Sequence, residues 1–175
     1  MRRAPGQGRR DRPCHSRRRH HECPFNHNIE EMNMSKAEKP LPQITPDKKP
    51  FWDAAGRSEL LLMKCSVCGR RRHPLYGGDS YMCPGCNTNR PPEWIKSTGK
   101  GKIITWTVIH RAFHPAFTED VPYVVVLALL DEGVRMMADL RGVKPEDVRE
   151  NMPVEVFFER LSDEITLPQF RPLSV

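Results

Sequence analysis

The stretch that decides the fold is Cys65-Ser66-Val67-Cys68, followed after fourteen residues by Cys83-Pro84-Gly85-Cys86. Two Cys-x-x-Cys pairs at this separation are typical of two zinc knuckles that hold one tetrahedral ion. Gly69 follows the first pair and Gly85 lies inside the second, as tight turns around a metal require. Four thiolates fill the coordination shell of Zn²⁺, so we expect Cys65, Cys68, Cys83 and Cys86 to bind a structural zinc ion rather than a catalytic one.

Two other uses of paired cysteines compete with zinc. A redox Cys-x-x-Cys needs a single pair that opens a helix in a thioredoxin-like unit, whereas this chain has two pairs among turn residues. A disulfide framework needs a secreted protein, and no signal peptide is visible, so we expect a cytoplasmic location. His73 is a further candidate ligand, but the four cysteines already complete the shell.

Composition favours short strands and turns, because the 175 residues include 17 prolines and 11 glycines. The longest apolar run, residues 124–130, is too short to cross a membrane, so we expect a soluble protein. The net charge of +6 is uneven. Residues 1–33 hold eight arginines against four acids, a net of +4, which leaves only +2 for the remainder. That near-neutral remainder is not typical of a phosphate-binding surface, although Arg70, Arg71 and Arg72 beside the first knuckle keep nucleic acid as an alternative.

We divide the chain into four segments. Residues 1–46 are predicted to be a disordered basic tail and linker, with Met34 as an alternative start and with Cys14 and Cys23 as incidental cysteines. Residues 47–62 form a helical segment, residues 63–95 the zinc ribbon, and residues 96–175 an OB-fold domain. A short helix is expected from Pro50 to Ser58. Its face of Phe51, Trp52 and Ala55 packs either on the protein's own core or on a partner, and the sequence leaves both open.

The C-terminal half alternates β-branched, aromatic and polar residues. Strands are predicted at residues 102–110, 123–130, 134–140, 154–160 and 166–173, with Asp131-Glu132-Gly133 as a hairpin turn. A helical turn near residues 145–148 falls where an OB fold carries its plug helix. The predicted fold is therefore mainly β with short N-terminal helices: a rubredoxin-like zinc ribbon followed by a five-stranded OB-fold barrel.

The barrel strands offer little for nucleic acid or catalysis. The second and third strands contain one aromatic residue and one arginine against three acids, so the base-stacking platform of nucleic-acid-binding OB folds is missing. Their apolar character fits core strands, and also a surface for another protein or an acyl chain. No Ser-His-Asp order or phosphate loop is present. The polar candidates for catalysis are His110, His114, Asp120 and Asp139, for which surface loop positions are the simpler interpretation.

Taken together, many short motifs between residues 47 and 173 resemble one known family. It is the acyl-CoA-associated zinc-ribbon/OB-fold family, also called domain of unknown function thirty-five. The motifs are Pro50-Phe51-Trp52, the ribbon from Cys65 to Cys86, Trp94, Gly99-Lys100-Gly101-Lys102-Ile103, Thr107-Val108-Ile109-His110, Pro122-Tyr123-Val124-Val125, Leu130-Asp131-Glu132-Gly133-Val134-Arg135, Pro145-Glu146-Asp147-Val148, Met152-Pro153-Val154-Glu155-Val156 and Leu167-Pro168-Gln169-Phe170-Arg171-Pro172.

The resemblance implies a non-catalytic accessory or scaffold subunit. Members of the family are typically partners of thiolase-like enzymes, including lipid-transfer-type thiolase homologues, in lipid, steroid or isoprenoid-precursor metabolism. The implied roles are completing the partner's CoA site, with acyl-CoA as a shared ligand, or stabilising the partner. Only the four cysteines are carried over as site residues. We expect the partner to contact Phe51, Trp52 and the ribbon edge from Tyr76 to Tyr81. A nucleic-acid-binding ribbon and barrel is the alternative, and a free-standing enzyme using His110 or His114 has little support.

Overall fold

The computed structural model describes residues 39–76 and 81–173. They belong to one compact unit, Lys36–Val175. The prediction of a disordered tail over residues 1–33, the alternative start at Met34 and the two tail cysteines lie outside the described residues. In the part of the chain that is described, no helix is long and apolar enough to cross a membrane.

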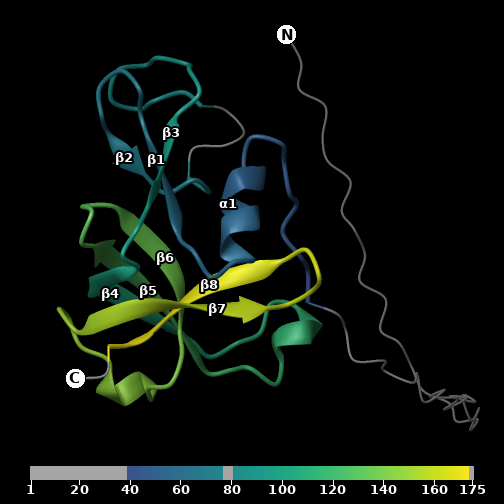
Figure 1. Ribbon diagram of the computed structural model, residues 1–175. Helices are drawn as coiled ribbons and strands as arrows, with labels where there is room; N and C mark the ends of the chain where they lie inside the picture. The colour runs from purple at the N-terminus through teal and green to yellow at the C-terminus, as the bar shows by residue number, and fades with distance from the viewer. Residues whose placement is uncertain (1–38, 77–80, 174–175) are drawn as a thin grey trace, which may run out of the picture. The chain divides into compact units, whose positions relative to one another are not determined.

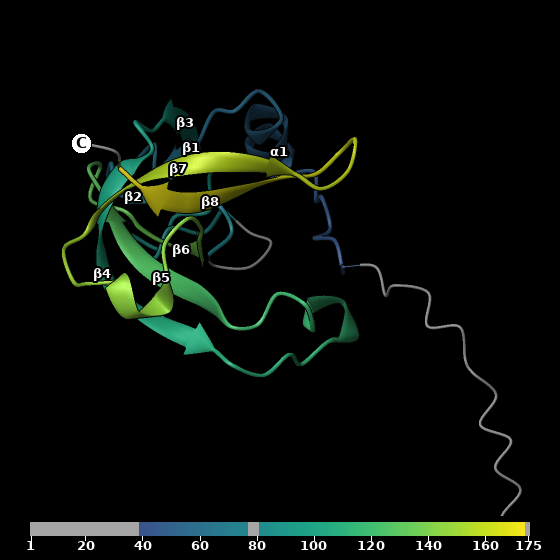
Figure 2. The same cartoon turned by 90° about the horizontal axis from the view of Figure 1, so that it is seen from below.

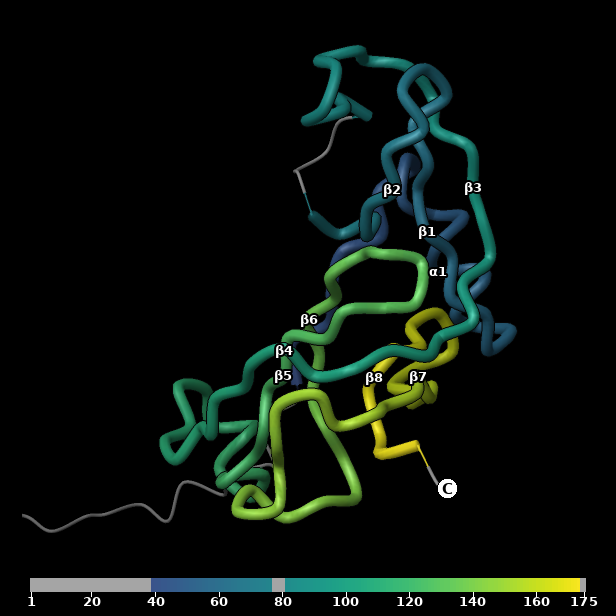
Figure 3. Tube along the Cα trace, turned by 90° about the vertical axis from the view of Figure 1, so that its left-hand side faces the viewer, coloured from purple at the N-terminus to yellow at the C-terminus, as the bar shows by residue number. Residues whose placement is uncertain are grey.

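Three short strands form the sheet that carries the cysteines. β1 (Leu61–Lys64) lies in the centre, between β2 (Arg71–Arg72) and β3 (Glu93–Lys96), and both pairings are antiparallel. β1 is central because Leu62 and Met63 are apolar and buried. β3 was not expected as a strand, yet its four residues pair with the whole of β1. Figure 3 shows the chain leaving β3 and passing directly into the barrel.

Five further strands close into a barrel, which confirms the predicted architecture. They are β4 (Lys100–Ile109), β5 (Tyr123–Leu130), β6 (Arg135–Leu140), β7 (Pro153–Arg160) and β8 (Thr166–Pro172), in the order β4-β5-β6-β8-β7 (Figure 1). β5 shows why the strands form: its residues alternate between half-buried and buried along the whole strand. The 3₁₀ turn η1 (Pro115–Phe117) follows β4, and η2 (Pro145–Asp147) occupies the expected plug position before β7.

The barrel closes at two seams of unequal length. β4 pairs with β7 only through Lys100, Gly101 and Lys102, and β6 pairs with β8 only through Leu140 and Phe170. Gly101, which lies in the first seam, has to be a glycine because of its neighbour on the other side of β4. A Cβ there would collide with the carbonyl oxygen of Leu129 on β5. Figure 2 shows the β7–β8 hairpin diverging from β4 and β5 beyond this seam.

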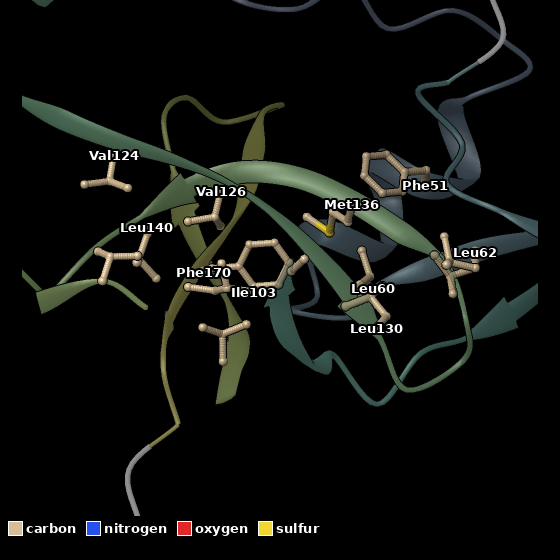
Figure 4. Close-up of a cluster of buried hydrophobic side chains, with 14 of the residues drawn as sticks. Phe51, Leu60, Leu62, Ile103, Val124, Val126, Leu130, Met136, Leu140 and Phe170 are labelled. Carbon is tan, nitrogen blue, oxygen red and sulfur yellow. The ribbon is translucent and has the colours of Figure 1, made fainter. Parts of the chain in front are cut away.

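One apolar core runs from the barrel interior to the helix. Ile103, Val126 and Phe170 fill the barrel, and Met136 and Leu130 connect them to the residues around α1 and β1 (Figure 4). All five side chains are at most 1% exposed. The ribbon segment and the barrel therefore share a single hydrophobic core.

The helix α1 (Lys49–Ala55) is part of that core, and this corrects one expectation. Phe51 and Trp52 are 0% and 2% exposed and pack against each other edge to face, with ring centroids 5.1 Å apart. The prediction that they contact a partner is therefore wrong, and the alternative of packing on the protein's own core is right. The helix also ends earlier than the predicted Ser58, which has a left-handed φ of 60°. In the described N-terminal region, α1 is one helix where several were expected.

Glu132, in the turn between β5 and β6, ties the barrel to the cysteine-bearing sheet. Its carboxylate accepts hydrogen bonds from Ser97 Oγ at 2.9 Å and from the backbone N of Thr98 at 2.6 Å. Its carbonyl oxygen accepts from Arg71 Nη1 at 3.3 Å. Partial burial raises the pKa of Glu132, but the hydrogen bonds from Thr98 and Ser97 to its carboxylate outweigh burial, so that the pKa lies below its ordinary value. The turn thus sets the position of β2 and of the β3–β4 connection relative to the barrel.

Candidate metal centre

The four predicted cysteines come together at one point. Cys65 Sγ lies 3.7 Å from Cys86 Sγ, and Cys68 Sγ lies 3.5 Å from Cys83 Sγ. All four sulfur atoms lie within 4.8 Å of one another. Tetrahedral zinc with Zn–S bonds of about 2.3 Å requires sulfur–sulfur separations of about 3.8 Å. The cluster therefore has the dimensions for one metal ion such as zinc, and each sulfur pair is too far apart for a disulfide.

The two knuckles have the same backbone construction. Gly69 N donates to Cys65 O at 2.9 Å, and Asn87 N donates to Cys83 O at 2.8 Å. Gly69 and Asn87 each follow the second cysteine of a pair, and each has a left-handed φ, 73° and 54°. Sequence reasoning had singled out Gly85 in the second turn, whereas Asn87 is the equivalent of Gly69. The sequence did carry a signal for this role of Asn87, because Asn tolerates the left-handed region better than most residues.

Backbone N–H groups prepare two of the sulfurs to be thiolates. The N–H groups of Cys68 and Val67 lower the pKa of Cys65 to about 6. The N–H of Gly85, 3.4 Å from Cys83 Sγ, lowers the pKa of Cys83. Cys68 differs: the N–H of Arg70 favours its thiolate, but hydrogen bonding to Cys83 and burial together raise its pKa to about 11. A bound cation would favour the thiolate form at all four positions, since metal binding releases the thiol protons.

The side chains around the four cysteines stabilise the two knuckle loops. Gly85 lies against the side chain of Arg70, because a Cβ at Gly85 would be 3.1 Å from Arg70 Cδ. Arg72 Nη1 donates to Met82 O at 3.0 Å, which ties β2 to the second knuckle. Thr88 Oγ1 lies 3.3 Å from Cys86 Sγ. The arginines that kept nucleic acid as an alternative thus have roles within the fold.

His73 is not brought to the cluster. Its side chain is 4% exposed, its ring packs against Phe51 at 5.4 Å and Tyr76 at 5.2 Å, and its Nδ1 accepts from Leu75 N at 3.3 Å. Burial lowers its pKa to about 4, so the ring is neutral at ordinary pH. His73 therefore lies in the core beside Phe51 and is not a further ligand of the cluster.

Three of the four polar candidates for catalysis have a local role. His114 Nδ1 accepts from Ala116 N at 3.2 Å and caps η1. Asp120 pairs with Lys39 at 2.6 Å, and Asp139 pairs with Arg141 at 3.1 Å. His110 is exposed at the end of β4. Within residues 39–76 and 81–173, the four cysteines are the only group of three or more His, Cys, Asp or Glu side chains placed to hold a metal ion.

The architecture now defines a class: a four-cysteine ribbon packed on a closed five-stranded barrel. Comparison with known proteins finds relatives that match the barrel and most of the chain. The family model described as "ChsH2, C-terminal OB-fold domain" matches residues 94–159. The solved chain titled "Ltp2-ChsH2(DUF35) aldolase" is 33% identical with a TM-score of 0.64, and the match covers 75% of this chain and 98% of that one.

Two relatives extend the comparison. A "DUF35 domain-containing scaffold protein" from Methanocaldococcus jannaschii is 35% identical over 105 residues, which are 60% of this chain and 71% of that protein. A "Probable enoyl-CoA hydratase alpha subunit" from Thermomonospora curvata is 34% identical over 139 residues, which are 78% of this chain but only 41% of that longer protein. The chain belongs to the DUF35 family, as its motifs had indicated.

Proposed function

We propose that this protein is a non-catalytic accessory subunit of a thiolase-like enzyme that acts on acyl-CoA thioesters, and that Cys65, Cys68, Cys83 and Cys86 hold one structural zinc ion. The observation that carries the proposal is the likeness to the chain titled "Ltp2-ChsH2(DUF35) aldolase", which extends over 98% of that chain. Its title names two components, Ltp2 and ChsH2(DUF35).

The names of other relatives support the proposal of a subunit in acyl-CoA metabolism. One is called a scaffold protein, and others are called alpha subunits of hydratases whose substrates are CoA thioesters. A non-catalytic role is supported by three of the polar candidates, because His114 caps η1 and Asp120 and Asp139 are engaged in ion pairs. The catalytic groups would then belong to the partner, and this chain would complete the partner's CoA site or stabilise the partner.

The zinc proposal rests on the closed geometry of the cluster. Four sulfurs leave no coordination position for water or substrate, so the ion would supply folding energy and no Lewis-acid chemistry. The ribbon has only short strands of two to four residues around the cluster. A cross-link between its two knuckles would compensate for this small amount of hydrogen-bonded structure.

Of the predicted ribbon edge from Tyr76 to Tyr81, residues 77–80 lie outside the described residues, and Tyr76 is the part of it that we propose as a partner contact once α1 is assigned to the core. Leu75, Tyr76 and Met137 are 39%, 40% and 57% exposed. They form one apolar patch, because the hydroxyl of Tyr76 accepts a hydrogen bond from the backbone N of Met137 at 2.6 Å. Exposed aromatic and methionine side chains are enriched at protein interfaces.

Affinity purification from the native cell tests the proposal. The full chain should retain a thiolase-like enzyme, and Tyr76→Ala should weaken that retention by tenfold or more if Tyr76 anchors the interface. Phe113→Ala is the matched control, because Phe113 is 88% exposed and lies outside the patch. Retention of nucleic acid in place of an acyl-CoA enzyme, lost at high salt, would favour the alternative function.

A further inference from the structure

The second half of β4 is an open sheet edge. Beyond the short seam with β7, the strand pairs with β5 along one side, and its last contact on the other side is the pair of hydrogen bonds that joins Ile103 to Asn151 and Met152. In the described residues, no backbone hydrogen bond reaches residues 104–109 from that side. Unpaired N–H and C=O groups in an extended strand are a template for another strand.

The sequence of this edge reads almost the same in both directions. Around Trp106 stand Thr105 and Thr107, then Ile104 and Val108. No charge and no proline interrupts residues 103–109, although these are the features that proteins commonly use to block an exposed edge. Trp106 is 37% exposed, which is unusual for a tryptophan that lies opposite the fully buried Val126.

We infer that this edge pairs antiparallel with the same edge of a second copy of the chain, across a twofold axis at Trp106. This register places Thr105 of one copy opposite Thr107 of the other, and Ile104 opposite Val108. Each is a β-branched pair of the kind that stabilises neighbouring strands. Trp106 meets its own counterpart and becomes covered. The register irregularity between Ile103 and Thr105 bounds the pairing at one end.

A second copy fits the edge because a twofold pairing uses one surface twice and needs no charge complementarity. The five residues from 104 to 108 span about 17 Å of strand, so the interface is smaller than that of a standard stable complex. The dimer should therefore form in the micromolar range and dissociate on dilution. This inference does not depend on the proposed function.

Charge substitutions on the full chain test both the dimer and its register. Thr105 and Thr107 are exposed on the same side of β4, so substitution there leaves the core intact. In the double variant Thr105→Lys/Thr107→Lys, like charges face each other across the axis and the dimer should be lost. In Thr105→Lys/Thr107→Glu, the new lysine of each copy faces the new glutamate of the other, and the dimer should persist.

The measurement is sedimentation equilibrium over a range of concentrations, with melting curves to show that each variant folds. The wild type should double its mass as concentration rises, and its amide hydrogen exchange at residues 105–108 should slow in parallel. A wild type that remains monomeric with unchanged exchange would overturn the inference. So would equal dimerisation of the two double variants, because their difference depends only on the proposed register.

Discussion

The burial of Phe51 gives the sharpest test of the assignment of α1 to the core. Phe51 is 0% exposed and contacts both Trp52 and His73 edge to face. Replacing a buried phenylalanine with alanine removes its transfer free energy and leaves a cavity, at a cost of about 3–5 kcal/mol. For a domain of this size, each kcal/mol lowers the melting temperature by about 2–4 °C, so Phe51→Ala should lower it by roughly 6–20 °C.

Thermal unfolding of the isolated chain, followed by circular dichroism, measures this effect, and Phe113→Ala is the matched control. Phe113 is 88% exposed, so its substitution should change the free energy of unfolding by no more than about 0.5 kcal/mol. If Phe51→Ala melted within the same range as Phe113→Ala, the reasoning would be refuted. Phe51 would then be a surface residue and again a candidate for a partner contact.

Three further predictions concern the metal centre, His73 and the barrel seam. Metal analysis should find one zinc per chain, and Cys83→Ser should lose both the zinc and the folded ribbon. The pKa of His73 is about 4 in the folded chain against 6.5 when unfolded, so its contribution to stability is complete above pH 6.5. That contribution is lost between pH 6.5 and pH 4, because the unfolded state gains the proton first. The free energy of unfolding of His73→Phe, measured with urea, should therefore decline less over this window than that of the wild type. Gly101→Ala should cost about 1–3 kcal/mol because its Cβ meets Leu129 O. Gly56→Ala should be tolerated in the same melting assay, because its Cβ would lie at an ordinary contact distance of 3.5 Å from Asp53 O.

Each of these predictions has a clear contrary result. A purified chain with little zinc and four titratable thiols would contradict the metal assignment. If the free energy of unfolding had the same pH dependence in wild type and in His73→Phe, the histidine would not be held neutral by burial. Equal stability of Gly101→Ala and wild type would mean that β4 and β5 separate around Gly101 more easily than their close approach indicates.

The barrel was predictable because its strands carry their own pattern. In residues 123–130, every second side chain is buried, and an apolar run bounded by Pro122 and the turn at Gly133 is enough to place that strand. The cysteine cluster was predictable for a different reason: the spacing of two Cys-x-x-Cys pairs alone indicates four thiols that gather at one point. Neither inference needed knowledge of contacts between distant residues.

Features that depend on tertiary contacts could not be predicted from the sequence. The face of Phe51 and Trp52 has the same pattern whether it packs inward or on a partner, and only the position of β1 and Met136 decides between them. β3 is four residues long and becomes a strand because β1 offers it an edge. The role of Glu132 depends on Ser97 and Thr98, which are distant from it in the sequence and contact it in the folded chain.

The central claim is that the chain assists an acyl-CoA enzyme without carrying out the reaction. The most direct measurement compares acyl-CoA turnover by the purified chain, by the thiolase-like enzyme that co-purifies with it, and by the two together. We expect no turnover by the chain alone, and an activity of the enzyme that depends on adding the chain. Turnover by the chain alone that His110→Ala abolishes, or an enzyme indifferent to the chain, would contradict it.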